Sequence, residues 1–168
     1  MHTQIITTPY GSLRALWSSA GLYACEFDRD RELERSVEHG EYQGHVDDQL
    51  MVQFEDAIET FFMTVQMDFD LTHLDWSGVS EFHRAILRLC FQIPAGETRT
   101  YGELAELAGR PRAARAVGTA MARNRWPILI PCHRVVGAGG KLAGYSGTGG
   151  IATKCSLLEF ESQATCNV

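Results

Sequence analysis

The chain of 168 residues lacks the features that would place it in a membrane or in an oxidising compartment. No apolar run approaches the roughly 20 residues that span a bilayer, and residues 1–20 lack the basic start and long apolar core of a secretory signal. The five cysteines are odd in number and include no CxxC pair, which argues against a disulfide framework and a zinc site. These absences predict a soluble cytoplasmic protein, or a nuclear one in a eukaryote, with reduced thiols.

Positive charge is scarce and unevenly placed. The net charge is −6, which by itself argues against a nucleic-acid partner. However, the net charge is −11 over residues 1–79, +5 over residues 80–135 and zero over residues 136–168. All nine Lys or Arg positions in the middle segment are arginines, whose planar guanidinium donates hydrogen bonds to phosphate in pairs. The middle segment therefore predicts a phosphate-binding surface, and a solvated arginine-rich face is the alternative.

The first part of the sequence predicts a small α/β domain over residues 1–75, followed by a linker near residues 72–78. Alternating apolar residues are typical of strands, and apolar residues at spacings of three and four are typical of a helix. The acidic residues 28–48 indicate a loop with a short helix. The expected strands are residues 4–8, 12–18, 22–27 and 67–71, and the expected helix is residues 50–64.

The second part, residues 76–168, reads as mainly helical. Ser80 is positioned to cap a helix that ends before Pro94, and Thr100 with Glu103 has the form of a capping box that opens a helix reaching residue 108. Gly109 and Pro111 then separate this helix from a second one over residues 112–123, which is rich in alanine and glycine. Two short helices joined by a tight turn form a helix-turn-helix pattern, in which the second helix usually meets DNA.

The tetrapeptide Pro131-Cys132-His133-Arg134 is the strongest chemical signal in the chain. It follows the apolar residues 128–130 and precedes Val135 and Val136. A thiol becomes a strong nucleophile as the thiolate, and a neighbouring imidazole can take its proton or stabilise its charge. An inert buried cysteine is the commoner interpretation of a Cys-His pair taken alone. The surrounding residues favour the activated thiol.

The order and spacing of these motifs resemble the O6-alkylguanine-DNA alkyltransferases, strongly over the second half of the chain and weakly over the first. The matching segments are Ile93-Pro94-Ala95-Gly96-Glu97-Thr98, Tyr101-Gly102-Glu103-Leu104-Ala105, Ala113-Ala114-Arg115-Ala116-Val117-Gly118, Asn124, Ile130-Pro131-Cys132-His133-Arg134-Val135, Gly144-Tyr145-Ser146-Gly147, Lys154, Leu157-Leu158 and Glu161. The resemblance implies an α+β fold: a small α/β amino-terminal domain followed by a mainly helical, winged helix-turn-helix-like, DNA-binding catalytic domain.

The resemblance also implies a set of catalytic roles. Cys132 would attack the alkyl carbon on O6 of guanine and keep the alkyl group, so that each molecule acts once, without cofactor or metal. His133 would take the thiol proton, directly or through a water, and Glu161 would orient the imidazole. Counting from Cys132 through the glycine-rich residues 146–151 leaves Glu159 open as the partner, but the expected register of the terminal helix favours Glu161.

The remaining roles concern guanine and duplex DNA. Because the reacting atom lies inside the duplex, the resemblance implies that the nucleotide is flipped out. Tyr145, Ser146 and the carbonyl of Val135 would contact guanine, and Asn124 would bracket the second helix against the cysteine loop. Arg115 would fill the vacated stack and Tyr101 would press on a phosphate. Further DNA contacts are expected from Arg112, Ala114, Met121 and Arg125.

The expected partner is double-stranded DNA containing O6-alkylguanine, bound by a monomer with no membrane association. One alternative is a non-catalytic relative that only marks alkylated DNA, but such relatives lack the cysteine that follows Pro131 here. Another is a Cys-His-Glu hydrolase acting on an acyl substrate, against which the arginines of the helix-turn-helix argue. Relatives often have proline after the asparagine, where this chain has Arg125, so the shape of that loop stays open.

Overall fold

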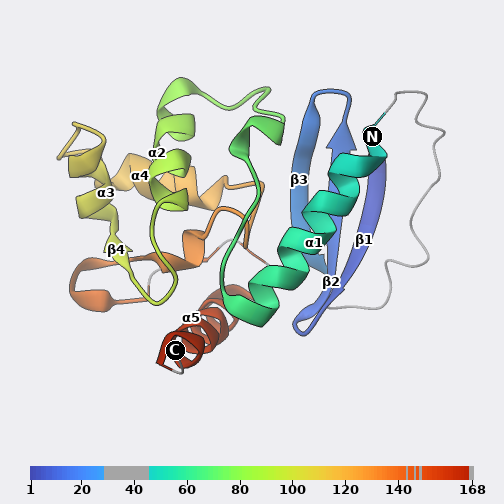
Figure 1. The fold of residues 1–168 in the computed structure, drawn as a ribbon. Coiled ribbons are helices and arrows are strands. Elements are labelled where there is room, and N and C mark those ends of the chain that lie inside the picture. Colours follow the sequence, from blue (N-terminus) through green and yellow to red (C-terminus); the bar gives the residue numbers. More distant parts are fainter. Residues whose placement is uncertain (29–45, 143, 146, 148, 167–168) are drawn as a thin grey trace. The chain divides into compact units, whose positions relative to one another are not determined.

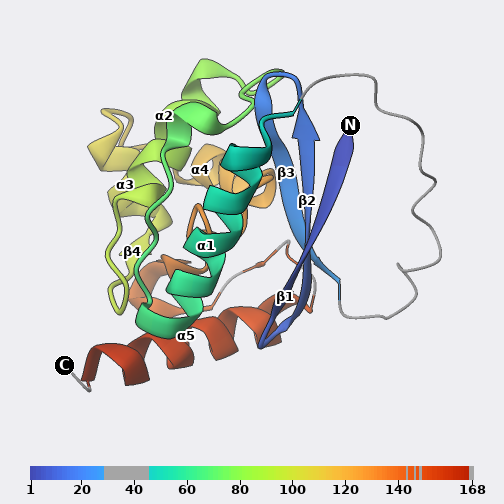
Figure 2. The ribbon, with the colours of Figure 1, turned by 45° about the vertical axis from the view of Figure 1, so that its right-hand side comes forward.

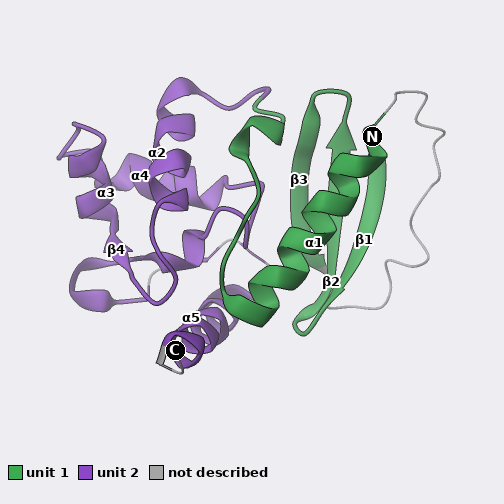
Figure 3. Ribbon diagram, in the orientation of Figure 1, with its two compact units in different colours: residues 1–76 green, residues 77–168 purple. Residues whose placement is uncertain are grey.

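The computed structural model describes residues 1–28, 46–142, 144–145, 147 and 149–166, which form two compact units, residues 1–76 and 77–168 (Figure 3). Each unit is built from elements that are contiguous in the sequence. Among the described residues, no helix is long and apolar enough to cross a membrane. The expectation of a loop with a short helix over residues 28–48 falls almost entirely outside the described residues.

The first unit is an antiparallel sheet with one helix packed on it (Figures 1 and 2). The strands β1 (His2–Thr8), β2 (Gly11–Ser18) and β3 (Gly21–Asp28) follow one another in space as in sequence. Every second residue of β2 from Leu13 to Trp17 is buried, which is the alternation expected of a strand with one face against a core. The helix α1 (Asp48–Thr64) contributes Phe54, whose ring meets that of Trp17 edge-on at 5.7 Å.

The predicted strand over residues 67–71 is wrong. Residues 66–70 pair with no described strand, and Leu71–His73 forms a 3₁₀ helix (η2) instead. Asp70 caps this turn, because its side chain accepts a hydrogen bond from the backbone N–H of Thr72 at 2.8 Å. An aspartate that satisfies nearby backbone groups competes with strand pairing, and Phe69 is buried with its ring against that of Phe54.

The second unit carries the helix pair. The helix α2 (Glu81–Phe91) is capped by Ser80, and β4 (Arg99–Thr100) leads into α3 (Tyr101–Leu107) through the capping box of Thr100 and Glu103. After a turn, α4 (Ala114–Ala122) packs against α2 and α3. The remaining elements are the 3₁₀ helix η3 (Cys132–Arg134), β5 (Val135–Val136), the 3₁₀ helix η4 (Ala138–Gly140) and α5 (Gly150–Cys166).

The second helix of the pair is shorter than the predicted 112–123. It begins at Ala114, because the turn before it is closed by a hydrogen bond from the N–H of Ala113 to the carbonyl of Arg110 at 2.8 Å. Gly109 has a φ of 69°, which lets the chain leave α3 at a sharp angle. The short parallel pair of β4 and β5 joins Arg99 to Val135 and so anchors the segment that follows Cys132.

Candidate active site

Cys132 is held by a sequence of tight turns at the end of a buried apolar segment. Residues 126–131 are buried, and Pro131 adopts φ −78° and ψ 64°, the dihedral angles of an inverse γ-turn. The N–H of Cys132 accordingly donates to the carbonyl of Ile130 at 2.8 Å. The cysteine then opens η3 and is 6% exposed. The bond to Ile130 fixes the backbone before the thiol, and a bond from the N–H of Val135 to the carbonyl of Cys132 fixes it after the thiol.

Asn124 ties the end of α4 to this segment. Its side-chain oxygen accepts from the N–H of Trp126 at 3.0 Å, and its side-chain nitrogen donates to the carbonyl of Ile130 at 2.9 Å. The N–H of Ile130 also donates to the carbonyl of Trp126 at 2.8 Å. These bonds hold Ile128 at a φ of 72°, which is unfavourable for a β-branched residue. Asn124 therefore links α4 to the carbonyl on which the N–H of Cys132 rests.

His133 and Glu161 form a fully buried pair behind the cysteine. The Nε2 atom of His133 lies 2.8 Å from Oε1 of Glu161, and both side chains have no exposed area. The Nδ1 atom of His133 is buried and has no hydrogen-bond partner among the described residues. Glu159 is exposed on the same helix. The structure thus places Glu161, rather than Glu159, against the imidazole.

Arg134 shares the same carboxylate, a contact that the sequence motifs did not predict. Its Nε donates to both oxygens of Glu161 at 3.1 and 3.0 Å, and a terminal nitrogen donates to Oε1 at 2.7 Å. The other terminal nitrogen donates to the carbonyl of Ile93 at 2.5 Å. Glu161 therefore binds both His133 and Arg134, the two residues that follow Cys132. The sequence does show a charged residue, Arg134, directly after the apolar cysteine segment. It does not show which residue Arg134 binds, because that partner is set by tertiary packing.

Lys154 is the second site residue whose role the sequence motifs did not predict. It is fully buried, and its Nζ donates to the carbonyl of Val135 at 2.6 Å. Lys154, Leu157 and Glu161 follow one another at spacings of three and four on α5, and all three are buried. This spacing places them on one face of the helix, so the helical register carried a usable signal. The Val135 carbonyl, expected to contact guanine, already accepts one hydrogen bond.

The electrostatics favour a neutral thiol beside a neutral imidazole. Burial raises the pKa of Cys132, and the Asn124 side chain and the Lys154 charge oppose this only in part. Burial lowers the pKa of His133, although Glu161 acts in the opposite direction. Burial would raise the pKa of Glu161, but hydrogen bonds from His133 and Arg134 lower it from 4.5 to about 2. The ionised carboxylate must accept from Nε2–H of His133, which leaves Nδ1 as the basic atom.

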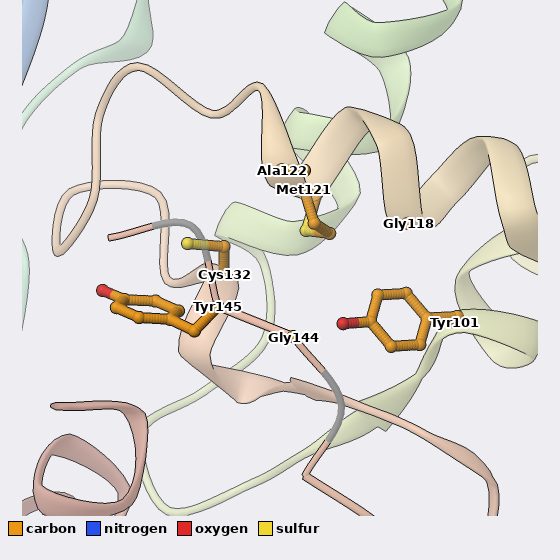
Figure 4. A pocket seen from close by; sticks show the side chains of 7 residues that line it. All are labelled: Tyr101, Gly118, Met121, Ala122, Cys132, Gly144 and Tyr145. Atoms are coloured by element: carbon orange, nitrogen blue, oxygen red, sulfur yellow. The ribbon is translucent and has the colours of Figure 1, made fainter. Parts of the chain in front are cut away.

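The thiol forms part of the wall of a cavity of about 290 Å³ in the second unit (Figure 4). This volume lies just below the usual range of about 300–1,000 Å³ for small-molecule sites. Cys132 and Tyr145 lie at one side of the cavity, and the Tyr101 hydroxyl points into it from the other side. The cavity is lined by Tyr101, Gly118, Met121, Ala122, Cys132, Gly144 and Tyr145.

The ring of Tyr145 occupies space that is open because residue 147 is a glycine. A Cβ atom at Gly147 would overlap the ring of Tyr145, so a side chain at that position would displace the ring from its place in the cavity wall. This overlap gives a packing reason for one glycine of the loop, besides its flexibility. Ser146, predicted to contact O6 of guanine, lies outside the described residues. Of the predicted guanine contacts, the structure therefore places Tyr145 beside the thiol and leaves Ser146 undescribed.

Some of the residues predicted to contact DNA are exposed, and others are partly or fully buried in the protein. Arg112 and Arg115 are exposed, just before and within the first turn of α4. Ala114 begins that helix and is half-buried, and Met121 is buried at the cavity wall. Arg125 is half-buried instead: its guanidinium lies 4.8 Å from the centre of the Trp126 ring and donates to the carbonyl of Ser77 at 3.1 Å.

Comparison with known proteins places this geometry in a family. Residues 81–163 match the family described as 6-O-methylguanine DNA methyltransferase, DNA binding domain. The methylated-DNA–protein-cysteine methyltransferase of Methanosarcina acetivorans is 33% identical over 165 residues, which cover 96% of this chain and 98% of that protein. The chain belongs to the methylated-DNA–protein-cysteine methyltransferase family. This confirms the resemblance inferred from the motifs.

Two further members of the family show how much of a relative's length this chain matches and how similar the folds are. The methyltransferase of Mycobacterium bovis is 46% identical over 106 residues, so the match spans 62% of that protein, less than two thirds of its length. The crystal structure of Mycobacterium tuberculosis OGT in complex with DNA superimposes with a TM-score of 0.77 at 35% identity, covering 98% of this chain and 94% of that one. This similarity confirms the predicted two-part α+β fold.

Proposed function

We propose that this protein repairs duplex DNA by moving the alkyl group of O6-alkylguanine irreversibly onto its own Cys132. The observation that carries the proposal is the position of the thiol: it lines a cavity of about 290 Å³, with the imidazole and carboxylate of His133 and Glu161 buried behind it. The relatives named methylated-DNA–protein-cysteine methyltransferase support the same reaction. The DNA complex of the mycobacterial OGT supports duplex DNA as the partner.

The chemistry is a displacement at the alkyl carbon. A bond forms between the sulfur of Cys132 and that carbon, and the bond from the carbon to O6 of guanine breaks. The thiol loses its proton to Nδ1 of His133, directly or through a water, while Glu161 holds Nε2–H and stabilises the imidazolium. Guanine leaves with the electrons of the broken bond and takes up one proton, so the net change moves the thiol proton to guanine.

The cavity suits an extruded guanine. Tyr145 lies at the same side of the cavity as Cys132. Its hydroxyl is buried in this structure, and we assign it the role of donating toward the departing base, which would lower the barrier. The carbonyl of Val135 has a second lone pair besides the one that Lys154 uses, and so can still accept from the exocyclic amine. Ser146 remains the proposed contact to O6.

The helix pair would deliver the nucleotide. Arg112 and Arg115 are exposed at the start of α4, where guanidinium groups would meet phosphate or enter the duplex. Tyr101, whose hydroxyl faces the cavity, would contact the phosphate next to the extruded nucleotide. Because Arg125 is already stacked on Trp126, we expect it to contribute to DNA binding less than Arg112 does.

The product also explains why one reaction is expected per molecule. A thioether is not hydrolysed by water at neutral pH, and the step requires neither a redox change nor a cofactor. We place the reaction in a monomer and in a reducing compartment, the cytoplasm or the nucleus of a eukaryote. There the thiol would stay available for attack.

The decisive experiment is incubation with duplex DNA containing O6-methylguanine, followed by intact-protein mass spectrometry. We expect one methyl group per molecule, on Cys132, and none on the Cys132→Ser variant. Cys155→Ser is the matched control, because Cys155 is a free, half-buried thiol that does not line the cavity. Repeated turnover, or full transfer by Cys132→Ser, would refute the mechanism, and turnover on an ester substrate would favour a hydrolase.

A further inference from the structure

Gly118 occupies the middle of α4, where glycine is unfavourable. It is the fifth of the nine residues of this helix. Glycine loses more backbone freedom than any other residue when it enters a helix, and after proline it is the poorest residue for a helix interior. Gly118 does not have a positive φ, so its backbone conformation is open to any residue. The local helix therefore offers no reason for glycine.

Packing inside the protein offers no reason either. A Cβ atom built on Gly118 meets no atom of the described residues within 4 Å, apart from its chain neighbours and its own helix backbone. Gly147 behaves differently, because a Cβ there would overlap the ring of Tyr145. The protein that surrounds Gly118 thus leaves room for a methyl group.

The cavity borders this position. Gly118 lines it together with Met121 and Ala122, which lie one turn further along the same helix. In Figure 4, Gly118 lies on the side of the cavity where Tyr101 enters, and Cys132 with Tyr145 lies on the other side. A side chain at position 118 would therefore take up open space at the side of the cavity that lies across from Cys132.

We propose that Gly118 is a specificity-determining residue, whose missing side chain keeps the cavity wide enough for an extruded nucleotide at a cost in helix stability. The proposal rests on the proposed function, because it assigns the cavity to the nucleotide that carries the alkyl group. It predicts that helix stability and repair oppose one another at this position. A residue that improves the helix should then impair the reaction.

The test uses Gly118→Ala and Gly118→Leu, with Gly102→Ala as the matched control. Gly102 is also a helical glycine without a positive φ, and its Cβ would make only an ordinary contact of 3.7 Å with the Oγ1 of Thr100. It does not line the cavity. Alanine and leucine both favour helices, so the two Gly118 variants differ mainly in the volume that they add to the cavity.

We expect Gly118→Ala, in a helix interior, to raise the melting temperature by about 2–4 °C, and Gly102→Ala, in the first turn of α3, to raise it by less. Gly118→Ala should slow single-turnover methyl transfer from O6-methylguanine in duplex DNA at least about tenfold, and Gly118→Leu should slow it further, because small displacements at a reacting centre are costly. Gly102→Ala should react like the wild type. Affinity for undamaged duplex DNA, measured in parallel, should change little in any variant.

Each other outcome has a distinct meaning. Wild-type rates in Gly118→Ala would overturn the proposal, and a lower melting temperature would overturn its premise that the position faces open space. An equal loss of affinity for undamaged DNA would place the effect on the outer surface of α4, which also overturns it. Absence of methyl transfer in the wild type would instead refute the proposed function.

Discussion

The cavity is bounded by two regions that are built in opposite ways. Behind Cys132, the ionisable side chains of His133, Arg134 and Glu161 are buried and bonded to one another at 2.7–3.1 Å. On the side of α3 and α4, the arginines at positions 112 and 115 are exposed, and the wall facing the cavity carries Gly118 and Ala122 beside the larger Tyr101 and Met121. The ionisable side chains of the first region are paired within the protein, whereas the arginines of the second region face the solvent.

This difference predicts which property a single substitution in each region should change: stability, chemistry or DNA affinity. In a buried network, removing one member leaves the others charged and unpaired, so stability and chemistry should fall together. On the exposed helix face, the proposed function implies that a substitution removes a contact made only in the complex with DNA. Stability should then stay constant while affinity or base extrusion changes. The following predictions test this separation, from the largest expected effect to the smallest.

Replacement of Glu161 by glutamine should have the largest effect of these. The amide keeps the shape but loses the charge that pairs with Arg134 and orients His133, so alkyl transfer should slow by about 10²-fold or more. Loss of the buried ion pair should also lower the free energy of unfolding by about 3–5 kcal/mol. DNA affinity should be nearly unchanged. Single-turnover rates, urea unfolding and DNA titration measure the three quantities.

Glu159→Gln provides the control for that prediction. Glu159 is exposed and lies two residues earlier on the same helix, so its replacement should leave rate and stability close to the wild type. The reverse ranking of the two variants would mean that the glycine-rich loop shifts the register of α5. The imidazole would then use a different carboxylate from the one assigned here.

Acid should destabilise the buried network in two stages. The pKa of His133 is lowered by burial, so the unfolded chain binds this proton more readily and stability falls as the pH drops below about 6.5. The pKa of Glu161 is lowered from 4.5 to about 2 by His133 and Arg134, against the effect of burial. Its contribution is therefore complete above pH 4.5 and disappears toward pH 2, a loss of roughly 3 kcal/mol.

Urea unfolding of the wild type and of Glu161→Gln between pH 7 and pH 3 measures this contribution. The variant should lose less stability over the acidic part of the range, because one titrating group has been removed. Parallel curves for the two proteins would show that Glu161 is not held in its ionised form by its neighbours. Arg115 is exposed and lies outside this buried network, so Arg115→Ala should follow the wild-type curve.

The sequence was most informative where chemistry depends on local order. The residues around Cys132, together with the family resemblance, indicate a nucleophilic thiol and its base, and the pattern of Lys154, Leu157 and Leu158 favours Glu161 over Glu159. The capping box of Thr100 and Glu103 likewise predicts the start of α3, which the structure confirms. These features depend on residues within a few turns of one another.

The contacts that the sequence did not reveal join distant segments. Arg134 reaches Glu161 across 27 positions and Ile93 across 41, and no local pattern encodes those distances. The predicted strand over residues 67–71 is wrong for a related reason: its apolar residues alternate, but Phe69 packs on Phe54 and Asp70 caps a turn. Tertiary packing and a single side-chain hydrogen bond outweighed the alternating pattern there.

The smallest expected effects lie on the exposed helix face, where Arg115 and Arg112 should behave differently. Extruding a base costs on the order of a few kcal/mol, and the proposed role of Arg115 is to occupy the stack that the base leaves. Arg115→Ala should therefore slow repair of a paired lesion about 10- to 100-fold, but should hardly affect reaction with free O6-benzylguanine, which needs no extrusion. Equal losses on both substrates would show that Arg115 supports the fold or the chemistry instead.

Arg112→Ala is the matched comparison, because it removes an exposed guanidinium three positions earlier, before the helix begins. If Arg112 only contacts phosphate, its loss should weaken binding to damaged and undamaged duplexes alike and reduce the slope of log affinity against log salt by about 0.9. Rates at saturating DNA should stay at the wild-type value. A lesion-specific rate defect in Arg112→Ala, with an unchanged salt slope, would assign extrusion to that residue and reduce Arg115 to a phosphate contact.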